Sequence, residues 1–236
     1  MTDNDIDSSL KILYADSHLI VVYKPARIPV ASEDSGDLTL LEQVREWNKS
    51  RQSEGKKGYC VPIHFLDRPV SGAVIFAISS KAASRLNEQF RNHKVKKTYI
   101  AISANKSPVL EGSVVDYLTK DNRLNMTRVC SQEESGAKRC ELSYNLIASD
   151  QGMNLYKVNP VTGRSHQIRV QFSNFGCPLY GDVKYGSTSS WDKRIALHAF
   201  RIEFTHPVTK EPMTINCDPP NYWDDIWKIK STFQNI

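Results

Sequence analysis

The sequence predicts an α+β fold built on a mixed, mainly antiparallel central sheet with flanking helices and loops. Predicted strands outnumber predicted helices, and most connections between them are short. Short connections favour antiparallel or mixed pairing, because parallel strands need a crossover of a dozen or more residues. The chain has 236 residues, enough to bury a hydrophobic core unaided. We therefore expect a flexible N-terminal tail at residues 1–10 and one folded domain at residues 11–236.

Apolar and β-branched runs mark the strands, and apolar residues at helical spacing mark the helices. The first two strands are separated by Ala-Asp-Ser-His, which suits a hairpin turn. Strands are predicted at residues 12–14, 19–23, 73–78, 98–102, 114–118, 140–147, 155–158 and 194–204. Helices are predicted at residues 38–47, after a cap at Ser79 or Ser80, at 165–175 and at 222–233. Loops are expected at residues 31–37 and 48–58.

Composition narrows the class of protein. The chain carries 31 basic and 26 acidic residues, a formal charge of +5 that modestly favours a polyanionic partner such as RNA. Its five cysteines are scattered and form no C-x-x-C pair, which argues against a disulfide framework and a structural zinc site. The polar start and the lack of 18 consecutive apolar residues argue against a signal peptide and a membrane span. We expect a cytoplasmic monomer without a metal.

A polar turn before a hydrophobic strand holds the most informative carboxylate. In His64-Phe65-Leu66-Asp67-Arg68-Pro69-Val70-Ser71-Gly72 the strand that follows can keep the turn rigid, so that Asp67 is aimed into a cleft. Taken alone, such a turn is more often an ordinary surface turn, in which Asp67 pairs with Arg68 or bonds nearby backbone. The turn becomes more specific when other motifs accompany it.

Four other segments accompany this turn, in a fixed order. They are Lys24-Pro25-Ala26, Lys97-Thr98-Tyr99, Thr162-Gly163-Arg164-Ser165-His166-Gln167-Ile168-Arg169, and Gly176-Cys177-Pro178-Leu179-Tyr180-Gly181-Asp182. Together with the Asp67 turn and the later Leu197-His198-Ala199 and His206-Pro207, they resemble the motifs of the RluA-type RNA pseudouridine synthases. The resemblance runs from about residue 11 to about residue 220, and implies a stand-alone catalytic domain.

The resemblance implies both a reaction and a fold. The reaction is isomerisation of specific uridines in ribosomal or transfer RNA: the base is detached, rotated and rejoined through a ring carbon, without a cofactor. The fold is the pseudouridine synthase catalytic fold, with an active-site cleft across the sheet. Asp67 corresponds to the catalytic carboxylate, which can act as a nucleophile or as a base, and both roles stay open. Arg169 matches the arginine that pairs with this aspartate, and Tyr99 matches the tyrosine that lies against the target base.

Further residues are candidates for contacts with the RNA. On a helix from residue 165, His166, Arg169 and Ser173 would lie opposite an apolar stripe, so that one face packs and the other meets a cleft. The basic run at residues 91–97 lies beside Tyr99 and suits a nucleic-acid surface. The predicted substrate-binding residues are Phe65, Arg68, Lys97, Arg164, His166 and Ile168.

The sequence also departs from the family pattern, which keeps a second function open. Phe65 stands where relatives carry an arginine that can insert into the RNA stack, and an aromatic ring could wedge between bases instead. Arg27 stands where many relatives have glycine, and Pro69 and Val70 replace a usual Asp-Thr pair. The alternative is a non-catalytic RNA-binding or ribosome-assembly protein that retains the fold. A hydrolase is poorly supported, because no second carboxylate and no metal-ligand cluster accompany Asp67.

Overall fold

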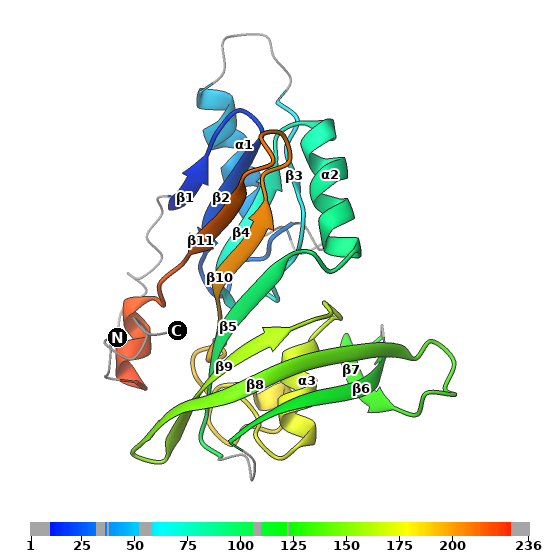
Figure 1. The fold of residues 1–236 in the computed structure, drawn as a ribbon. Helices are drawn as coiled ribbons and strands as arrows, with labels where there is room; N and C mark the ends of the chain where they lie inside the picture. Colours follow the sequence, from blue (N-terminus) through cyan, green and yellow to red (C-terminus); the bar gives the residue numbers. More distant parts are fainter. Residues whose placement is uncertain are drawn as a thin grey trace. The chain divides into compact units, whose positions relative to one another are not determined.

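The computed structural model describes residues 10–31, 36, 38–51, 58–105, 110–121 and 123–227 (Figure 1). Nearly all of the predicted N-terminal tail, much of the two predicted loops and the end of the last predicted helix lie outside these residues. The chain divides into two compact units. Unit 1 contains residues 1–95 and 200–217, and unit 2 contains residues 96–199 and 218–236. The prediction of one catalytic domain stays a prediction.

Unit 1 is a sheet whose strands come from both ends of the chain. Its strand order is β1-β2-β4-β10, with β11 paired to β10 and β3 paired to β4. The pairs β1–β2, β2–β4, β3–β4 and β10–β11 are antiparallel. The strands are β1 (Ile12–Ala15), β2 (Leu19–Lys24), β3 (Val61–Pro62), β4 (Ser71–Ala77), β10 (Leu197–Thr205, in unit 1 from Phe200) and β11 (Pro212–Asn216).

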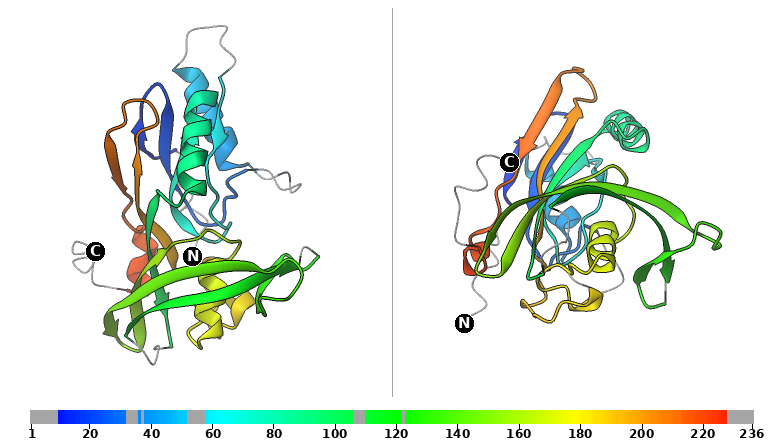
Figure 2. Two further views of the ribbon diagram at one scale, coloured as in Figure 1. Left: turned by 45° about the vertical axis from the view of Figure 1, so that its right-hand side comes forward. Right: turned by 60° about the horizontal axis from the view of Figure 1, so that its bottom comes forward.

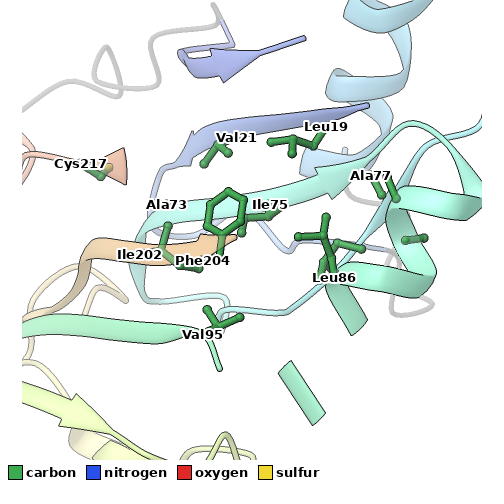
Figure 3. Close-up of a cluster of buried hydrophobic side chains, with 13 residues drawn as sticks. Leu19, Val21, Ala73, Ile75, Ala77, Leu86, Val95, Ile202, Phe204 and Cys217 are labelled. Carbon is green, nitrogen blue, oxygen red and sulfur yellow. The ribbon is translucent and has the colours of Figure 1, made fainter. Parts of the chain in front are cut away.

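The core of unit 1 lies between this sheet and helix α2 (Ser80–Arg91). All seven residues of β4 are buried, as expected for a central strand without a free face. Ser79 caps α2 by accepting a hydrogen bond from the N–H of Ala82, and the helix turns Leu86 inward toward Ile75 and Phe204 (Figure 3). Burying one such leucine contributes about 1.5–3 kcal/mol, so this packing fixes the strands from which the Asp67 turn projects.

A second helix of unit 1, α1 (Leu40–Ser50), begins with a capping box. The side chain of Thr39 accepts from the N–H of Glu42, and the carboxylate of Glu42 accepts from the N–H of Thr39. Leu40 and Val44 are buried. The predicted helix at residues 38–47 is therefore confirmed, with its start two residues later and its end three residues later.

Unit 2 is an antiparallel sheet in the order β5-β9-β8-β6-β7, with helix α3 (Gln167–Asn174) packed against β6 and β7 (Figure 2). Its strands are β5 (Lys96–Ser103), β6 (Glu111–Asp121), β7 (Met126–Cys130), β8 (Lys138–Asp150) and β9 (Met153–Pro160). Phe172 of α3 meets Tyr144 and Tyr156 edge to face, with ring centroids 5.8 and 5.4 Å apart. This aromatic packing anchors α3 to the sheet.

The mainly antiparallel α+β prediction is confirmed, and every predicted strand is present. Three strands were not predicted: β3, β7 and β11 have two to five residues, too few to show an apolar period against their turns. The predicted α-helix at residues 222–233 is wrong in its described part, where the 3-10 helix η2 (Asn221–Asp225) follows two prolines. Trp223 and Trp227 are nonetheless buried. Within the described residues, no helix has the length and apolar character needed to cross a membrane.

Candidate active site

In unit 1, the turn that carries Asp67 is fixed to β4 on its N-terminal side. The N–H of Ile63 donates to the carbonyl of Ile75 at 2.9 Å, and the N–H of Ile75 donates to Nε2 of His64 at 3.2 Å. The N–H of Val70 closes the turn on the carbonyl of Asp67 at 3.0 Å. Asp67 is half-buried, whereas the ring of Phe65 is 66% exposed. The turn is thus held by backbone bonds while both side chains keep access to solvent.

A buried lysine holds the turn on its C-terminal side. The ammonium of Lys24 donates to the carbonyls of Pro25, Ile28 and Arg68, at 2.9, 2.7 and 3.1 Å. The register of β2 and β4 pairs Lys24 with Gly72, which brings its side chain under the turn. Three carbonyls match the three donors of an ammonium group, so one side chain joins the loop after β2 to the residue next to Asp67.

The charge of this lysine also acts on the turn. Burial lowers the pKa of Lys24 to about 7, and the neighbouring Asp67 opposes that shift by attracting the cation. The nearby carboxylate thus favours the protonated form of Lys24, while burial and the cation of Arg68 disfavour it. Lys24 was not among the predicted site residues. Its signal was the Lys-Pro step at the end of a strand, but a sequence alone does not show a lysine to be buried.

The family resemblance leads to an expectation of glycine at the position of Arg27, and the backbone there has a conformation that favours glycine. Arg27 has φ 76°, in the left-handed region where a side chain costs about 1–2 kcal/mol. Its N–H donates to the carbonyl of Arg68 at 2.7 Å, and its own carbonyl accepts from Nε of Arg68 at 2.9 Å. These two bonds hold the strained residue in place. They also fix the side chain of Arg68, a predicted substrate-binding residue that is exposed.

In unit 2, the predicted residue Arg169 is buried in a bidentate ion pair. Its Nε and Nη2 donate to the two carboxylate oxygens of Asp182 at 2.8 and 2.9 Å. The guanidinium also lies over the ring of Tyr185, 4.9 Å from its centre. Asp182 follows Gly181, whose φ is 85° and where a Cβ would lie 2.4 Å from the carbonyl oxygen of Arg194. Only glycine fits there, which explains part of the Gly-Asp motif.

Tyr185 links Arg169 to His166. Its hydroxyl lies 2.7 Å from Nδ1 of His166 and accepts from the N–H of Thr127 at 2.9 Å. His166 itself has φ 54° and begins α3 without a side-chain cap. His166, Arg169, Tyr185 and Asp182 therefore form one network, of which the sequence predicted the first two.

The loop before α3 brings Lys97 and Arg164 to the same place. Gln167 ties the loop together, because its Oε1 accepts from the hydroxyl of Thr162 at 2.7 Å and from the N–H of Arg164 at 3.0 Å. The ammonium of Lys97 donates to the carbonyl of Thr162 at 3.4 Å, and burial lowers the pKa of Lys97 to about 8. Nε of Arg164 donates to the carbonyl of Arg139 at 3.1 Å. Gln167 was not predicted, although it stands inside the motif.

The predicted division of α3 into a packed face and a cleft face is wrong. Ile168, predicted to lie on the packed face, and Arg169, predicted to face the cleft, are only 6% and 5% exposed. Every residue of α3 from Gln167 to Phe172 is buried, because the helix is short and packed on all sides. Tyr99 is half-buried on β5, where it pairs with Val158. In the described part of the chain, no group of three or more His, Cys, Asp or Glu residues could hold a metal ion.

A family model described as RNA pseudouridylate synthase matches residues 18–174, a segment that contains Lys24, Asp67, Tyr99 and Arg169. The chain belongs to this family. The dual-specificity RNA pseudouridine synthase RluA of Haemophilus influenzae is 32% identical over 89% of this chain and 94% of that protein. The tRNA pseudouridine synthase C of Pasteurella multocida is 32% identical over 94% of this chain and 96% of that protein. The predicted RluA-type membership is confirmed.

A solved structure of human RNA Pseudouridylate Synthase Domain Containing 4 has the same fold. It is 24% identical to this chain, with a TM-score of 0.74, and the match covers 90% of each chain. The predicted enzyme class, an RNA pseudouridine synthase, is confirmed by the family and the relatives. The roles of individual residues in this pseudouridine synthase stay predictions.

Removing the carboxylate of Asp182 should destabilise the enzyme strongly. Asp182→Asn leaves the buried guanidinium of Arg169 without its counter-charge, which typically costs about 3–5 kcal/mol. The free energy of unfolding in urea measures the loss. Glu134→Gln is the control, because it breaks the exposed ion pair with Arg128 and should have little effect. Equal stability of the two variants would show that Arg169 does not depend on Asp182.

Lys24 should make the stability of the enzyme depend on pH. In the unfolded chain its pKa is the ordinary 10.5, and in the folded chain about 7, so the unfolded chain binds more protons between these values. The stability of wild type relative to Lys24→Met should therefore rise from about pH 7 to pH 10.5 and fall as the pH drops through about 7. Urea unfolding across this range measures the slope. Lys49 is exposed and serves as the control. If the stability of wild type relative to Lys49→Met changed with pH by the same slope, the prediction would be wrong.

Proposed function

We propose that this pseudouridine synthase isomerises specific uridines in transfer or ribosomal RNA, with Asp67 as its catalytic carboxylate. One observation carries the proposal: Asp67 lies on a turn whose next carbonyl, that of Arg68, accepts from the buried Lys24 and from the N–H of Arg27. Because the backbone of the turn is held in this way, the carboxylate of Asp67 has a fixed attachment point and still remains accessible to a substrate. The names of the two relatives support these RNA classes, because one acts on tRNA and the other has dual specificity.

The half-buried state of Asp67 suits either chemical role. As a nucleophile it would form a bond to the sugar carbon as the base leaves, and as a base it would take a proton from the sugar. In both cases the detached uracil rotates and is rejoined through a ring carbon, and the proton at that carbon is released. Both routes start from the ionised carboxylate, which the cation of Lys24 attracts. One assay of pseudouridine formation therefore tests Asp67 in both roles, as nucleophile and as base.

Arg169 and Tyr99 are proposed to support catalysis. Asp182 and Tyr185 fix the guanidinium of Arg169, so it keeps a single orientation toward a reacting group. The half-buried ring of Tyr99 suits stacking on the target base, because the ring is apolar on its face and polar at its tip.

The remaining predicted residues are proposed to bind the RNA around a flipped uridine. Base flipping is needed because the reacting atoms cannot be reached inside a stacked helix. Phe65 and Arg68 would act from the Asp67 turn, while Lys97, Arg164, His166 and Ile168 belong to the segments around α3. The enzyme is proposed to act as a cytoplasmic monomer without a cofactor, and its five free cysteines are consistent with a reducing compartment.

Asp67→Asn should abolish pseudouridine formation. The variant keeps the shape of the side chain and removes its charge, so activity should fall by at least about 100-fold, the lower end for a positioned acid or base. Tritium release from uracil carbon 5 measures the reaction, with transfer and ribosomal RNA prepared from cells that lack this gene. Exposed Asp150→Asn is the matched control and should keep full activity.

The same assay decides between the enzyme and a non-catalytic RNA-binding protein. Release by wild type and by Asp150→Asn, but not by Asp67→Asn, supports the proposed role of Asp67. Binding without release from any RNA by wild type would favour the non-catalytic alternative. Equal release by wild type and Asp67→Asn would remove Asp67 from the mechanism.

Replacing Phe65 should weaken RNA binding. A stacked base contributes about 1–3 kcal/mol, so Phe65→Ala should raise the Kd for substrate RNA by about 5- to 150-fold. Phe65→Arg should retain most of the affinity, because a guanidinium can also stack on a base. Leu38→Ala is the control, since Leu38 is equally exposed at 64%. Equal Kd values for Phe65→Ala and Leu38→Ala, measured by filter binding, would show that Phe65 does not stack.

A further inference from the structure

A polar pocket lies in unit 1, and none of its lining residues belongs to the Asp67 turn. It has a volume of about 240 Å³, and its lining residues come from α2, the segment after it and the region of the turn that joins β10 to β11. Three of its lining residues are cationic and one is acidic. The lining residues are Arg85, Glu88, Gln89, Asn92, Lys94, Thr205 and Lys210. The residue types favour an anion over an apolar ligand.

The walls of this pocket are held by hydrogen bonds. The side-chain amide of Gln89 donates to the carbonyl of Thr205 and accepts from its N–H, at 2.8 and 2.9 Å. The N–H of Lys94 donates to the carbonyl of Gln89 at 2.9 Å. On the opposite side, Nε2 of buried His206 lies 2.8 Å from the carboxylate of Asp16, which fixes the start of the β10–β11 turn. The pocket is therefore preformed.

Two of its cations are brought together by one carbonyl oxygen. Nη1 of Arg85 and the ammonium of Lys210 both donate to the carbonyl of Pro207, at 2.8 and 3.2 Å. The two charges thus lie within two hydrogen-bond lengths of each other. Among the described residues, neither forms an ion pair with Glu88 or with any other carboxylate. Like charges this close repel, and a bound anion would relieve the repulsion.

We infer that this pocket binds a backbone phosphate of the RNA substrate, away from the uridine that reacts. The inference rests on the proposed function, because it takes RNA as the partner. Guanidinium and ammonium groups are the usual ligands of nucleic-acid phosphates. The pocket is smaller than the roughly 300–1,000 Å³ that a whole small-molecule ligand fills, so it suits a single group. Such a contact positions the RNA without reading its sequence.

The salt dependence of RNA binding tests the inference. Arg85→Gln/Lys94→Gln removes two charges, and glutamine at position 85 can still donate to the carbonyl of Pro207. Loss of one phosphate contact should reduce the slope of log K against log salt by about 0.7–0.9 and weaken binding several-fold at low salt. Lys11→Gln/Lys49→Gln removes two exposed charges of unit 1 that lie outside α2 and outside the pocket lining, and should leave the slope unchanged. At saturating RNA, kcat should equal that of wild type for both.

Each outcome decides the inference. The inference would be overturned if the pocket variant had the same salt slope as wild type. It would also be overturned if the control variant lowered the slope as much as the pocket variant does. If inorganic phosphate protects wild type but not the pocket variant against heat while the RNA slopes agree, the pocket takes free phosphate and the RNA assignment is wrong. Should the double variant unfold, the exposed single variant Lys94→Gln should still lower the slope, and an unchanged slope overturns the inference. Failure of the proposed function is seen separately, as no tritium release by wild type.

Discussion

The Asp67 turn depends on one buried ammonium group. Lys24 satisfies three backbone carbonyls at once, one of them beside Asp67, and no neutral side chain of similar size offers three donors. The β2–β4 register brings this group to its place, and the packing on both faces of β4 fixes the register, because a shift by one residue would exchange the side chains that the two faces present. Hydrophobic packing thus determines where the ammonium of Lys24 lies, and the hydrogen bonds of that ammonium hold the Asp67 turn in place.

Unit 2 fixes its own cation by a different device. Arg169 is held by a carboxylate and an aromatic ring, whereas Lys24 is held by backbone carbonyls. The carboxylate compensates the charge of Arg169, so the guanidinium is oriented but its field is reduced. The three hydrogen-bond acceptors of Lys24 are all backbone carbonyls, and the nearby carboxylate of Asp67 favours its protonated form. This chain therefore holds one buried cation in an ion pair and another on backbone carbonyls beside Asp67.

The sequence predicted the fold class, the positions of most strands along the chain and the Asp67 turn, because these depend on local patterns. Asp67 was recognised through a short motif, and the strand behind it through a run of apolar residues. Lys24, Gln167 and Asp182 were missed as site residues, because their importance comes from burial and from partners distant in the sequence. The division of α3 into two faces was wrong for the same reason. A helical pattern shows which residues share a face, but it does not show how many sides are covered.

Unit 1 is built from two segments that are far apart in the sequence, and this affects the order in which its sheet can form during synthesis. Its core joins residues of β2, β4 and α2 to Ile202, Phe204 and Cys217. A ribosome therefore finishes the whole of the first 199 residues before β10 and β11 can complete this sheet. Until then, one edge of β4 has only the two residues of β3 as partners. That edge waits for β10 while residues 78–196 are made, about half of the chain, and an uncovered strand edge in a nascent chain is a place where other chains can pair.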